Sequence, residues 1–258
     1  MRWMLCFLFL CSVAHADSLI YQGINYIEDA KINSASANTN YGTGTQISVY
    51  ALATASRSLL IRAYGVAEML TSSDYVDSVR LGLYASAFTS CNSQPEKIAF
   101  YRVLKPFAEA YMTWNDWYTT DSEWTTAGCQ NAADSVDNRG DGARPDRWAT
   151  AFDTLIISTT GWQYLDITDL FNNWRTGTYA ENGILGKPIS FPCFDYAETR
   201  DSVNFWSTNY TTDTTLRPRL AIYYHVVEAS AEVPRYRQGP RGCDVRTSPS
   251  GASRRTGP

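Results

Sequence analysis

The sequence predicts an all-β protein, a jelly-roll β-sandwich with one short helix near residues 167–175. Short stretches rich in β-branched and aromatic residues recur along the chain, and turn-forming residues such as Gly, Asn, Asp and Ser separate them. Only one stretch has the spacing of an amphipathic helix. Strands are expected at residues 24–32, 46–51, 58–63, 78–84, 97–103, 151–157, 164–167, 189–194, 204–208 and 219–225.

The first sixteen residues have the pattern of an export signal. Arg2 gives a positive start, residues 4–13 form an apolar run, and Ala14 and Ala16 are the small residues of a cleavage site. The run is too short to span a bilayer, which takes roughly 20 residues. The alternatives are a retained anchor or a buried first strand. We expect residues 1–16 to be a signal peptide and the mature protein to be secreted and extracellular.

The rest of the chain divides into a globular zone and a tail. Residues 17–228 are long enough to bury a sizeable core and form the expected jelly-roll domain. Residues 229–258 are rich in Arg and Pro, which predicts a disordered basic tail; binding an acidic polymer is the alternative role. We expect no membrane contact after signal cleavage, and the net charge of −4 argues against nucleic acid as a partner.

Side-chain periodicity supports the assigned elements. Alternation is blurred at residues 80–84 and 220–224, which indicates strands covered on both faces. In the helix, Leu170 and Trp174 fall on one face, with Thr168 as the expected cap and Gly177 as the end. Because they lie in regular elements, three tryptophans are expected in the core: Trp162, Trp174 and Trp206.

Four cysteines remain after the signal: Cys91, Cys129, Cys193 and Cys243. Export permits disulfides, and four cysteines allow three pairings. We favour Cys91–Cys129, because both residues lie in irregular segments that a covalent tie would hold; the pairing of Cys193 and Cys243 stays open. The cysteine spacing matches no zinc-binding pattern.

The scarcity of histidine argues against catalysis that depends on a histidine base. His225 is the one histidine outside the signal, and it ends the last expected strand. A Ser-His-Asp or Cys-His system would have to use it. Glycosidases instead need two carboxyl groups across a cleft, and the sequence leaves such a pair open. Catalysis is therefore not the favoured function, although a stand-alone polysaccharide lyase or hydrolase remains an alternative.

Aromatic residues in loop-like segments are the candidates for ligand binding. Aromatic faces stack on the apolar C–H faces of sugar rings, and arginine pairs with the carboxylates of uronic acids. The alternative role of these rings is core packing. The candidate ligand-binding residues are Trp114, Trp117, Tyr118, Arg147 and Trp148.

An acidic segment, residues 133–147, is a candidate for structural calcium. It carries Asp134, Asp137, Asp141 and Asp146 among Gly and Asn, and calcium takes several oxygen ligands from such loops; Asp134, Asp137 and Asp141 are the candidate ligands. The spacing differs from that of an EF-hand, and a solvated loop is the alternative.

Several short motifs occur in an order that resembles the DNRLRE-domain family. They are Asn-Tyr-Gly-Thr at 40–43, Arg-Ser-Leu-Leu-Ile-Arg at 57–62, Met-Thr-Trp-Asn at 112–115, Trp-Gln-Tyr-Leu-Asp-Ile-Thr at 162–168, Asn-Gly-Ile-Leu at 182–185 and Arg-Pro-Arg-Leu at 217–220. Together they span about residues 24–224. Residues 29–34 share only Asp29 with the string that names the family, and Ala63-Tyr64 replaces its usual Phe-Asp pair.

The resemblance implies a jelly-roll domain grouped with carbohydrate-binding module family ninety-six. Its relatives accompany secreted polysaccharide-degrading enzymes and cell-surface proteins. We therefore expect a secreted, non-catalytic domain that binds a polysaccharide, with an acidic one as a candidate. A structural or adhesive extracellular module is the alternative, and the departures from the family leave the ligand open.

Overall fold

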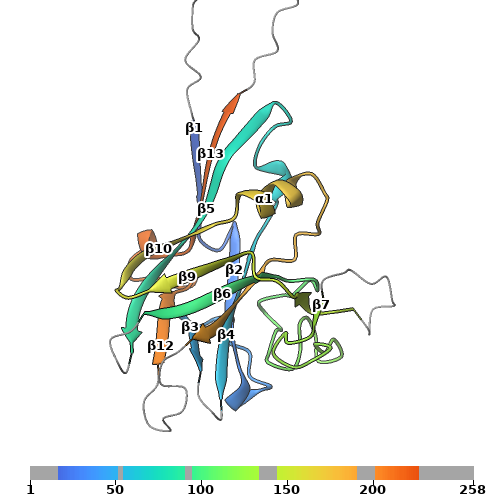
Figure 1. Ribbon diagram of the computed structural model, residues 1–258, viewed down its shortest axis with the longest axis vertical. Helices are drawn as coiled ribbons and strands as arrows, with labels where there is room; N and C mark the ends of the chain where they lie inside the picture. The colour runs from blue at the N-terminus through green and yellow to red at the C-terminus, as the bar shows by residue number, and fades with distance from the viewer. Residues whose placement is uncertain (1–16, 52–54, 91–94, 134–143, 191–200, 227–258) are drawn as a thin grey trace, which may run out of the picture. The chain divides into compact units, whose positions relative to one another are not determined.

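The computed structural model describes residues 17–51, 55–90, 95–133, 144–190 and 201–226. They are mostly β-strand with one α-helix, which confirms the predicted all-β sandwich with a short helix (Figure 1). The strands are β1 (Asp17–Gln22), β2 (Ile27–Asn33), β3 (Gln46–Ala51), β4 (Ser56–Ala63), β5 (Asp74–Thr89), β6 (Glu96–Arg102), β7 (Ala132–Ala133), β8 (Arg147–Trp148), β9 (Asp153–Ile157), β10 (Gly161–Asp166), β11 (Ile184–Ser190), β12 (Asp201–Trp206) and β13 (Arg219–Val226).

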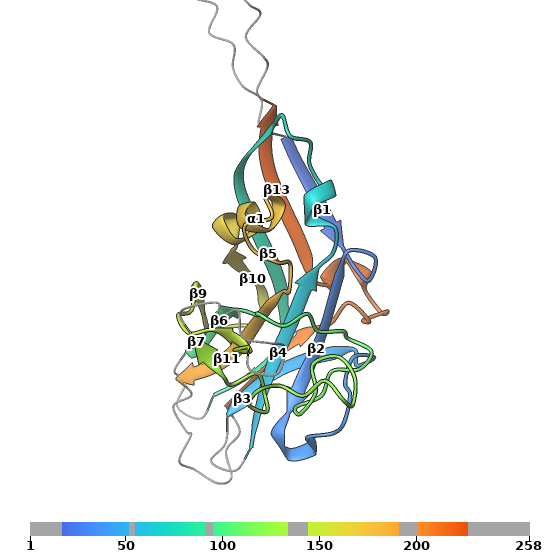
Figure 2. The same cartoon turned by 90° about the vertical axis from the view of Figure 1, so that its right-hand side faces the viewer.

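The main sheet curls around a long central strand. Its order is β1-β13-β5-β12-β3-β4-β11-β6-β9, with β10 added to β5 and β2 added to β4. Strand β5, of 16 residues, pairs with β13, β10 and β12 along its length. All pairings in this sheet are antiparallel, while β7 and β8 form a separate parallel pair. Figure 2 shows β1, β5 and β13 running together beside α1.

Helix α1 (Thr168–Arg175) lies where the sequence places it, but its cap differs. The N-cap position is Ile167, and the Asp166 carboxylate accepts from the backbone N–H of Thr168 at 2.9 Å. The Thr168 hydroxyl accepts from the backbone N–H of Val79 at 2.9 Å. Thr168 thus ties the helix to β5, and Asp166 satisfies the exposed amide. Gly177, with φ 71°, ends the helix as predicted.

Two strand predictions differ from the structure. Strand β1 lies outside the expected strands and covers the free edge of β13. Strand β11 begins at Ile184, five residues before the expected start at Ile189, so Gly186 and Pro188 lie within it. Pro188 precedes a register shift in the pairing with β6, which accommodates a residue without an N–H donor.

Strand β4 is buried on both of its faces. Leu59 and Ile61 join the main core, which also contains Phe100, Phe171 and Phe205. Leu60, on the opposite face, joins a second cluster of Ala30, Ile32, Val103, Phe107, Met112, Trp124, Cys129 and Leu185. The continuous run of apolar residues in β4 is thus typical of a strand covered on two sides.

The second cover is the segment 103–148, here called the insertion, of which 134–143 is outside the described residues. Figure 2 shows its green part crossing in front of β2 and β4. Because the insertion supplies Phe107, Met112 and Trp124 to the second cluster, it forms an extra layer on that face of the sheet.

The core prediction for tryptophan was correct at one of three positions. Trp174 is buried against the main core, whereas Trp162 and Trp206 are only partly buried. Side chains alternate along a strand, so Trp162 points to the face opposite buried Leu165, three residues on. Trp206 likewise alternates with the fully buried Phe205.

The globular unit ends at Val227, and the remaining unit, Glu228–Pro258, lies outside the described residues. None of the helices in the described ranges is long and apolar enough to cross a membrane.

Candidate functional site

The insertion is held together by the buried carboxylate of Asp146. Its oxygens accept hydrogen bonds from the backbone N–H groups of Thr125, Thr126 and Asn131, at 2.8, 3.0 and 3.1 Å. The Lys105 ammonium, also buried, lies 3.0 Å from Asp146 Oδ1. Main-chain bonds join Asp146 to residue 104 and to Asn131. Asp146 therefore fixes both arms of the insertion at one point.

Three clefts lie along the insertion in the described part of the chain. The first, here called the arginine cleft, has a volume of about 340 Å³. In it the Arg102 guanidinium lies 3.7 Å from the centre of the Tyr179 ring and 4.7 Å from that of Trp148. Burial lowers the pKa of Arg102, although Tyr179 opposes the shift. Arg102 is 8% exposed, so the wall of the cleft contains a nearly buried cation in contact with two aromatic rings.

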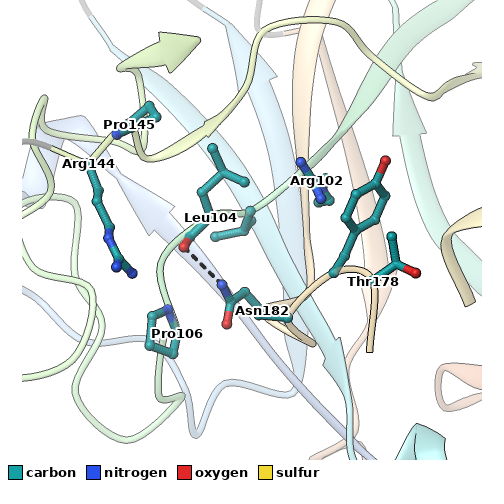
Figure 3. Close-up of a pocket in the computed structure, with 10 residues that line it drawn as sticks. Arg102, Leu104, Pro106, Arg144, Pro145, Thr178 and Asn182 are labelled. Atoms are coloured by element: carbon teal, nitrogen blue, oxygen red, sulfur yellow. Dashed lines mark hydrogen bonds between the residues drawn. The ribbon is translucent and has the colours of Figure 1, made fainter. Parts of the chain in front are cut away.

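The other side of the arginine cleft is formed by Arg144, Pro145 and Pro106. In Figure 3, Leu104 lies between Arg144 and Arg102, and Asn182 donates a hydrogen bond of 2.9 Å to the Leu104 carbonyl. Arg144 is exposed. The cleft therefore combines two guanidinium groups with apolar walls.

The second cleft, the Trp117 cleft, has a volume of about 560 Å³. It shares Leu104, Pro106 and Arg144 with the arginine cleft. Its own residues are Lys105, Trp117, Asp121 and Ser122. The two clefts are neighbours because Arg144 borders both.

The third cleft, the acidic cleft, has a volume of about 590 Å³ and lies where the insertion meets β2 and β4. Glu28 and Arg62 are directly opposite in the β2–β4 pairing, and their side chains form an ion pair at 2.5 Å. The Tyr64 hydroxyl donates to Glu28. Burial, followed by the bond to Glu28, raises the pKa of Tyr64 to about 12. Tyr118, which is 46% exposed, forms another part of the lining.

Acidic groups gather in the wall of this cleft and behind it. Asn209 Nδ2 donates to Glu109 Oε1 at 2.9 Å, and burial raises the pKa of Glu109 despite this bond. Asp29 is completely buried, and its Oδ2 accepts from the backbone N–H of Thr208 at 2.8 Å. Burial raises the pKa of Asp29 to about 8; the Thr208 amide opposes this, and Glu109 adds to it. Asp29 is therefore protonated in the folded protein near neutral pH.

The clefts include two of the five predicted ligand-binding residues. Trp117 lines the Trp117 cleft and Tyr118 lines the acidic cleft, with their ring centres 5.8 Å apart. Trp148 lies behind the arginine cleft, where it supports Arg102.

The two remaining candidates have structural contacts. Arg147 stacks on Tyr101, with 4.2 Å from its guanidinium to the ring centre, and donates to the Trp148 carbonyl at 3.1 Å. Trp114 packs on the left-handed Gly128 (φ 80°), where a Cβ would come within 2.4 Å of the indole. Trp114 therefore fixes the loop of the insertion.

The predicted calcium ligands Asp134, Asp137 and Asp141 lie outside the described residues. Within the described ranges, no group of three or more His, Cys, Asp or Glu side chains could hold a metal ion. Cys129 is a free, buried thiol, contrary to the predicted Cys91–Cys129 disulfide; Cys91, Cys193 and Cys243 are outside the described residues. The Cys129 Sγ instead lies 3.7 Å from the Asp146 carbonyl oxygen, inside the second cluster.

His225 lies on β13, as predicted, and its Nδ1 is 2.9 Å from the Asp77 carboxylate. It is not among the residues that line the three clefts.

Sequence reasoning missed most of the cleft residues because they come from distant segments. Glu28 pairs with Arg62 through the register of β2 and β4. The contacts of Asp146 with Lys105 and with the insertion backbone, here called the clamp, bring Arg144 next to Leu104. One usable signal was local: Arg102 is the next-to-last residue of the expected strand 97–103, directly before the start of the insertion. The cleft residues that the sequence did not indicate are Glu28, Arg62, Tyr64, Arg102, Glu109, Arg144 and Tyr179.

Comparison with known proteins found no match for this chain. No family model matches the chain, and no curated protein matches it either.

We predict that Asp146→Asn destabilises the protein by about 3–5 kcal/mol, because it leaves the Lys105 ammonium buried without its partner. Urea unfolding, followed by circular dichroism, measures the change. The control is Asp121→Asn, at an exposed position of the same segment, which should change the free energy of unfolding by less than about 0.5 kcal/mol. Equal stabilities of the two variants would contradict the role of the clamp.

The raised pKa of Asp29 predicts that stability falls as pH rises from about 5 to 7. In this window the folded state keeps a proton that the unfolded state has lost, so the slope is about −1.4 kcal/mol per pH unit for this group. Asp29→Asn keeps an acceptor for Thr208 but cannot titrate, and should flatten the slope by that amount. Urea unfolding at pH 5, 6 and 7 tests this; a variant as steep as the unmodified protein would refute it.

Proposed function

We propose that this protein is a secreted, non-catalytic carbohydrate-binding domain that recognises a polysaccharide. The observation that carries the proposal is the series of clefts along the insertion. The arginine cleft and the Trp117 cleft share three residues, and Trp117 and Tyr118 link the second cleft to the acidic cleft. A polymer makes repeated contacts along its length, and a series of clefts matches that kind of ligand.

The residue types in the clefts match the chemistry of sugars. A pyranose ring has apolar C–H faces that stack on aromatic rings and hydroxyl groups that exchange hydrogen bonds. Trp117, Tyr118 and Tyr179 provide rings, while Asn182 and Ser122 provide polar groups beside them. The motif order shared with the DNRLRE-domain family and the signal-like residues 1–16 also support a secreted binding domain.

An acidic polysaccharide is the favoured ligand. Arg102 and Arg144 border one cleft of about 340 Å³, and a guanidinium matches the planar geometry of a carboxylate. Stacking between Trp148 and Tyr179 holds Arg102 in position without neutralising its charge. A uronic acid unit placed here would meet the exposed Arg144, with the nearly buried Arg102 beside it.

A second candidate function is glycoside hydrolysis, because Glu28 and Glu109 both line the acidic cleft. The contacts of these groups favour binding instead. Glu28 is held by Arg62 and Tyr64, and Glu109 by Asn209. A general acid and its partner must be available to the glycosidic bond. Release of new reducing ends, lost in Glu109→Gln, would support the enzyme over the binding domain.

Retention of the protein in gels that contain immobilised acidic or neutral polysaccharides tests binding directly. We expect slower migration in at least one gel and no release of products. Absence of retention across the panel would overturn the proposal and favour a structural or adhesive module.

We predict that Trp117→Ala weakens binding to the retained polysaccharide by about tenfold, since an aromatic contact contributes about 1 kcal/mol beyond area burial. Trp117 also packs on the second cluster, so Tyr118→Ala, at a more exposed ring, is a second test. The control is Tyr75→Ala, which removes a 59% exposed ring on β5. Normal retention of both cleft variants, with circular dichroism unchanged, would exclude this part of the site.

Arg144→Ala should reduce the affinity for an acidic polysaccharide by about tenfold or more, because a hydrogen bond to a charged group contributes about 1.5–3 kcal/mol. The effect should shrink as salt is raised, since exposed charges are screened. Arg80→Ala, which removes an exposed arginine on β5, is the control for net charge. Equal losses for the two variants would indicate non-specific attraction.

A further inference from the structure

A second group of aromatic side chains lies on the outer face of the sheet, away from the insertion. Trp162 on β10 is directly opposite Tyr84 on β5, and Tyr164 is opposite Gly82. On the other side of Gly82 lies Arg219 of β13. Directly opposed residues of antiparallel strands share a face of the sheet. Their neighbours Leu81, Leu83 and Leu165 are buried in the core, so this group is on the outer face.

The rings and the guanidinium of this group form a stacked array. The ring centres of Trp162 and Tyr164 are 6.0 Å apart, with 20° between their planes. The Arg219 guanidinium lies 3.9 Å from the centre of the Trp162 ring and donates to the Tyr164 hydroxyl. Tyr84 meets Trp162 edge-on, with 5.5 Å between ring centres. The four side chains therefore hold one another in fixed positions.

Gly82 lets this array lie close against the sheet. A Cβ at position 82 would come within 3.1–3.2 Å of Arg219 Cγ, Tyr164 Cε1 and Trp162 Cζ3. These distances are shorter than ordinary carbon–carbon contacts of 3.5–4.0 Å. The absence of a side chain at Gly82 thus brings the rings and the arginine stem down over the strand.

The array is open to solvent, unlike the aromatic rings of the core. Tyr164 is 42% exposed, and Trp162, Tyr84 and Arg219 are partly exposed, whereas Phe205 is fully buried. Partly exposed aromatic rings beside a cation are suited to a sugar ring, with C–H groups on the rings and oxygen substituents near the guanidinium. The net charge of −4 disfavours nucleic acid, the other ligand that stacks on such rings.

We propose that Tyr84, Trp162, Tyr164 and Arg219 form a second saccharide-binding surface, so that one domain holds a polysaccharide at two separate places. This inference rests on the proposed function, because the ligand is the same polymer. Two contacts on one chain raise the affinity for long polymers far above that for short fragments, by a factor of about 10²–10⁴ where both are engaged. The clefts and the array would then act together on one polymer or join two polymers.

The test compares variants of the full chain, using the polysaccharide that retains the unmodified protein and a hexasaccharide prepared from it. Isothermal titration with the hexasaccharide should give two sites per chain for the unmodified protein. Tyr164→Ala should weaken one of the two sites at least tenfold, and Trp117→Ala should weaken the other about tenfold. Tyr223→Ala, which removes a 40% exposed ring elsewhere on β13, is the matched control and should keep two sites. Affinity of Tyr164→Ala for the long polymer should fall at least tenfold.

The possible failures are distinguishable. A stoichiometry of one for the unmodified protein, or unchanged affinities for the hexasaccharide and the polymer in Tyr164→Ala, overturns the second surface alone. Absence of binding to every polysaccharide overturns the proposed function and this inference together. If circular dichroism shows that Tyr164→Ala is unfolded, Arg219→Gln replaces it, and an unchanged second site in that variant also overturns the proposal.

Discussion

The layer that carries the clefts depends on a carboxylate enclosed by protein. Asp146 accepts hydrogen bonds from three backbone N–H groups and pairs with one ammonium. These contacts fix the geometry of the insertion, which has little regular structure, as backbone hydrogen bonds fix that of a strand in a sheet. Desolvation of the ion pair is costly, and the three amide donors offset that cost. Because Lys105 and residue 144 flank the clefts, the same contact that folds the insertion also sets the distance across them.

At the acidic cleft too, a carboxylate connects separate parts of the chain. Glu28 joins β2 to β4 through Arg62 and accepts the backbone N–H of Glu109, so it connects the sheet to the insertion. Behind it, Asp29 and Glu109 hold the loop that contains Thr208 and Asn209. Carboxyl groups thus connect the β2–β4 pair, the insertion and the loop after β12, which are distant in sequence. These connections bring the lining residues of the cleft together.

The sequence predicted the fold better than the site because the two depend on different information. Period-2 patterns and turn residues are local, and they placed most strands and α1 within a few residues. Strand β4 was located correctly because its continuous apolar run is buried on both faces, by the main core on one and by the second cluster on the other. Site residues depend on register and loop closure, so the pairing of Glu28 with Arg62 was not visible. Trp162 was assigned to the core because it lies in a regular element, although its odd separation from the buried Leu165 places it on the opposite face of the strand.

Cys129 has a consequence for how this protein withstands oxidation. Its thiol is enclosed by the second cluster, and burial, followed by the nearby Asp146 charge, raises its pKa. Thiol–disulfide exchange proceeds through the thiolate, and it needs access to the attacking sulfur. Cys129 lacks both, because its raised pKa disfavours the thiolate and the second cluster blocks access to its sulfur. The packing itself therefore shields the thiol, and reaction of Cys129 with a thiol reagent would report loss of that packing.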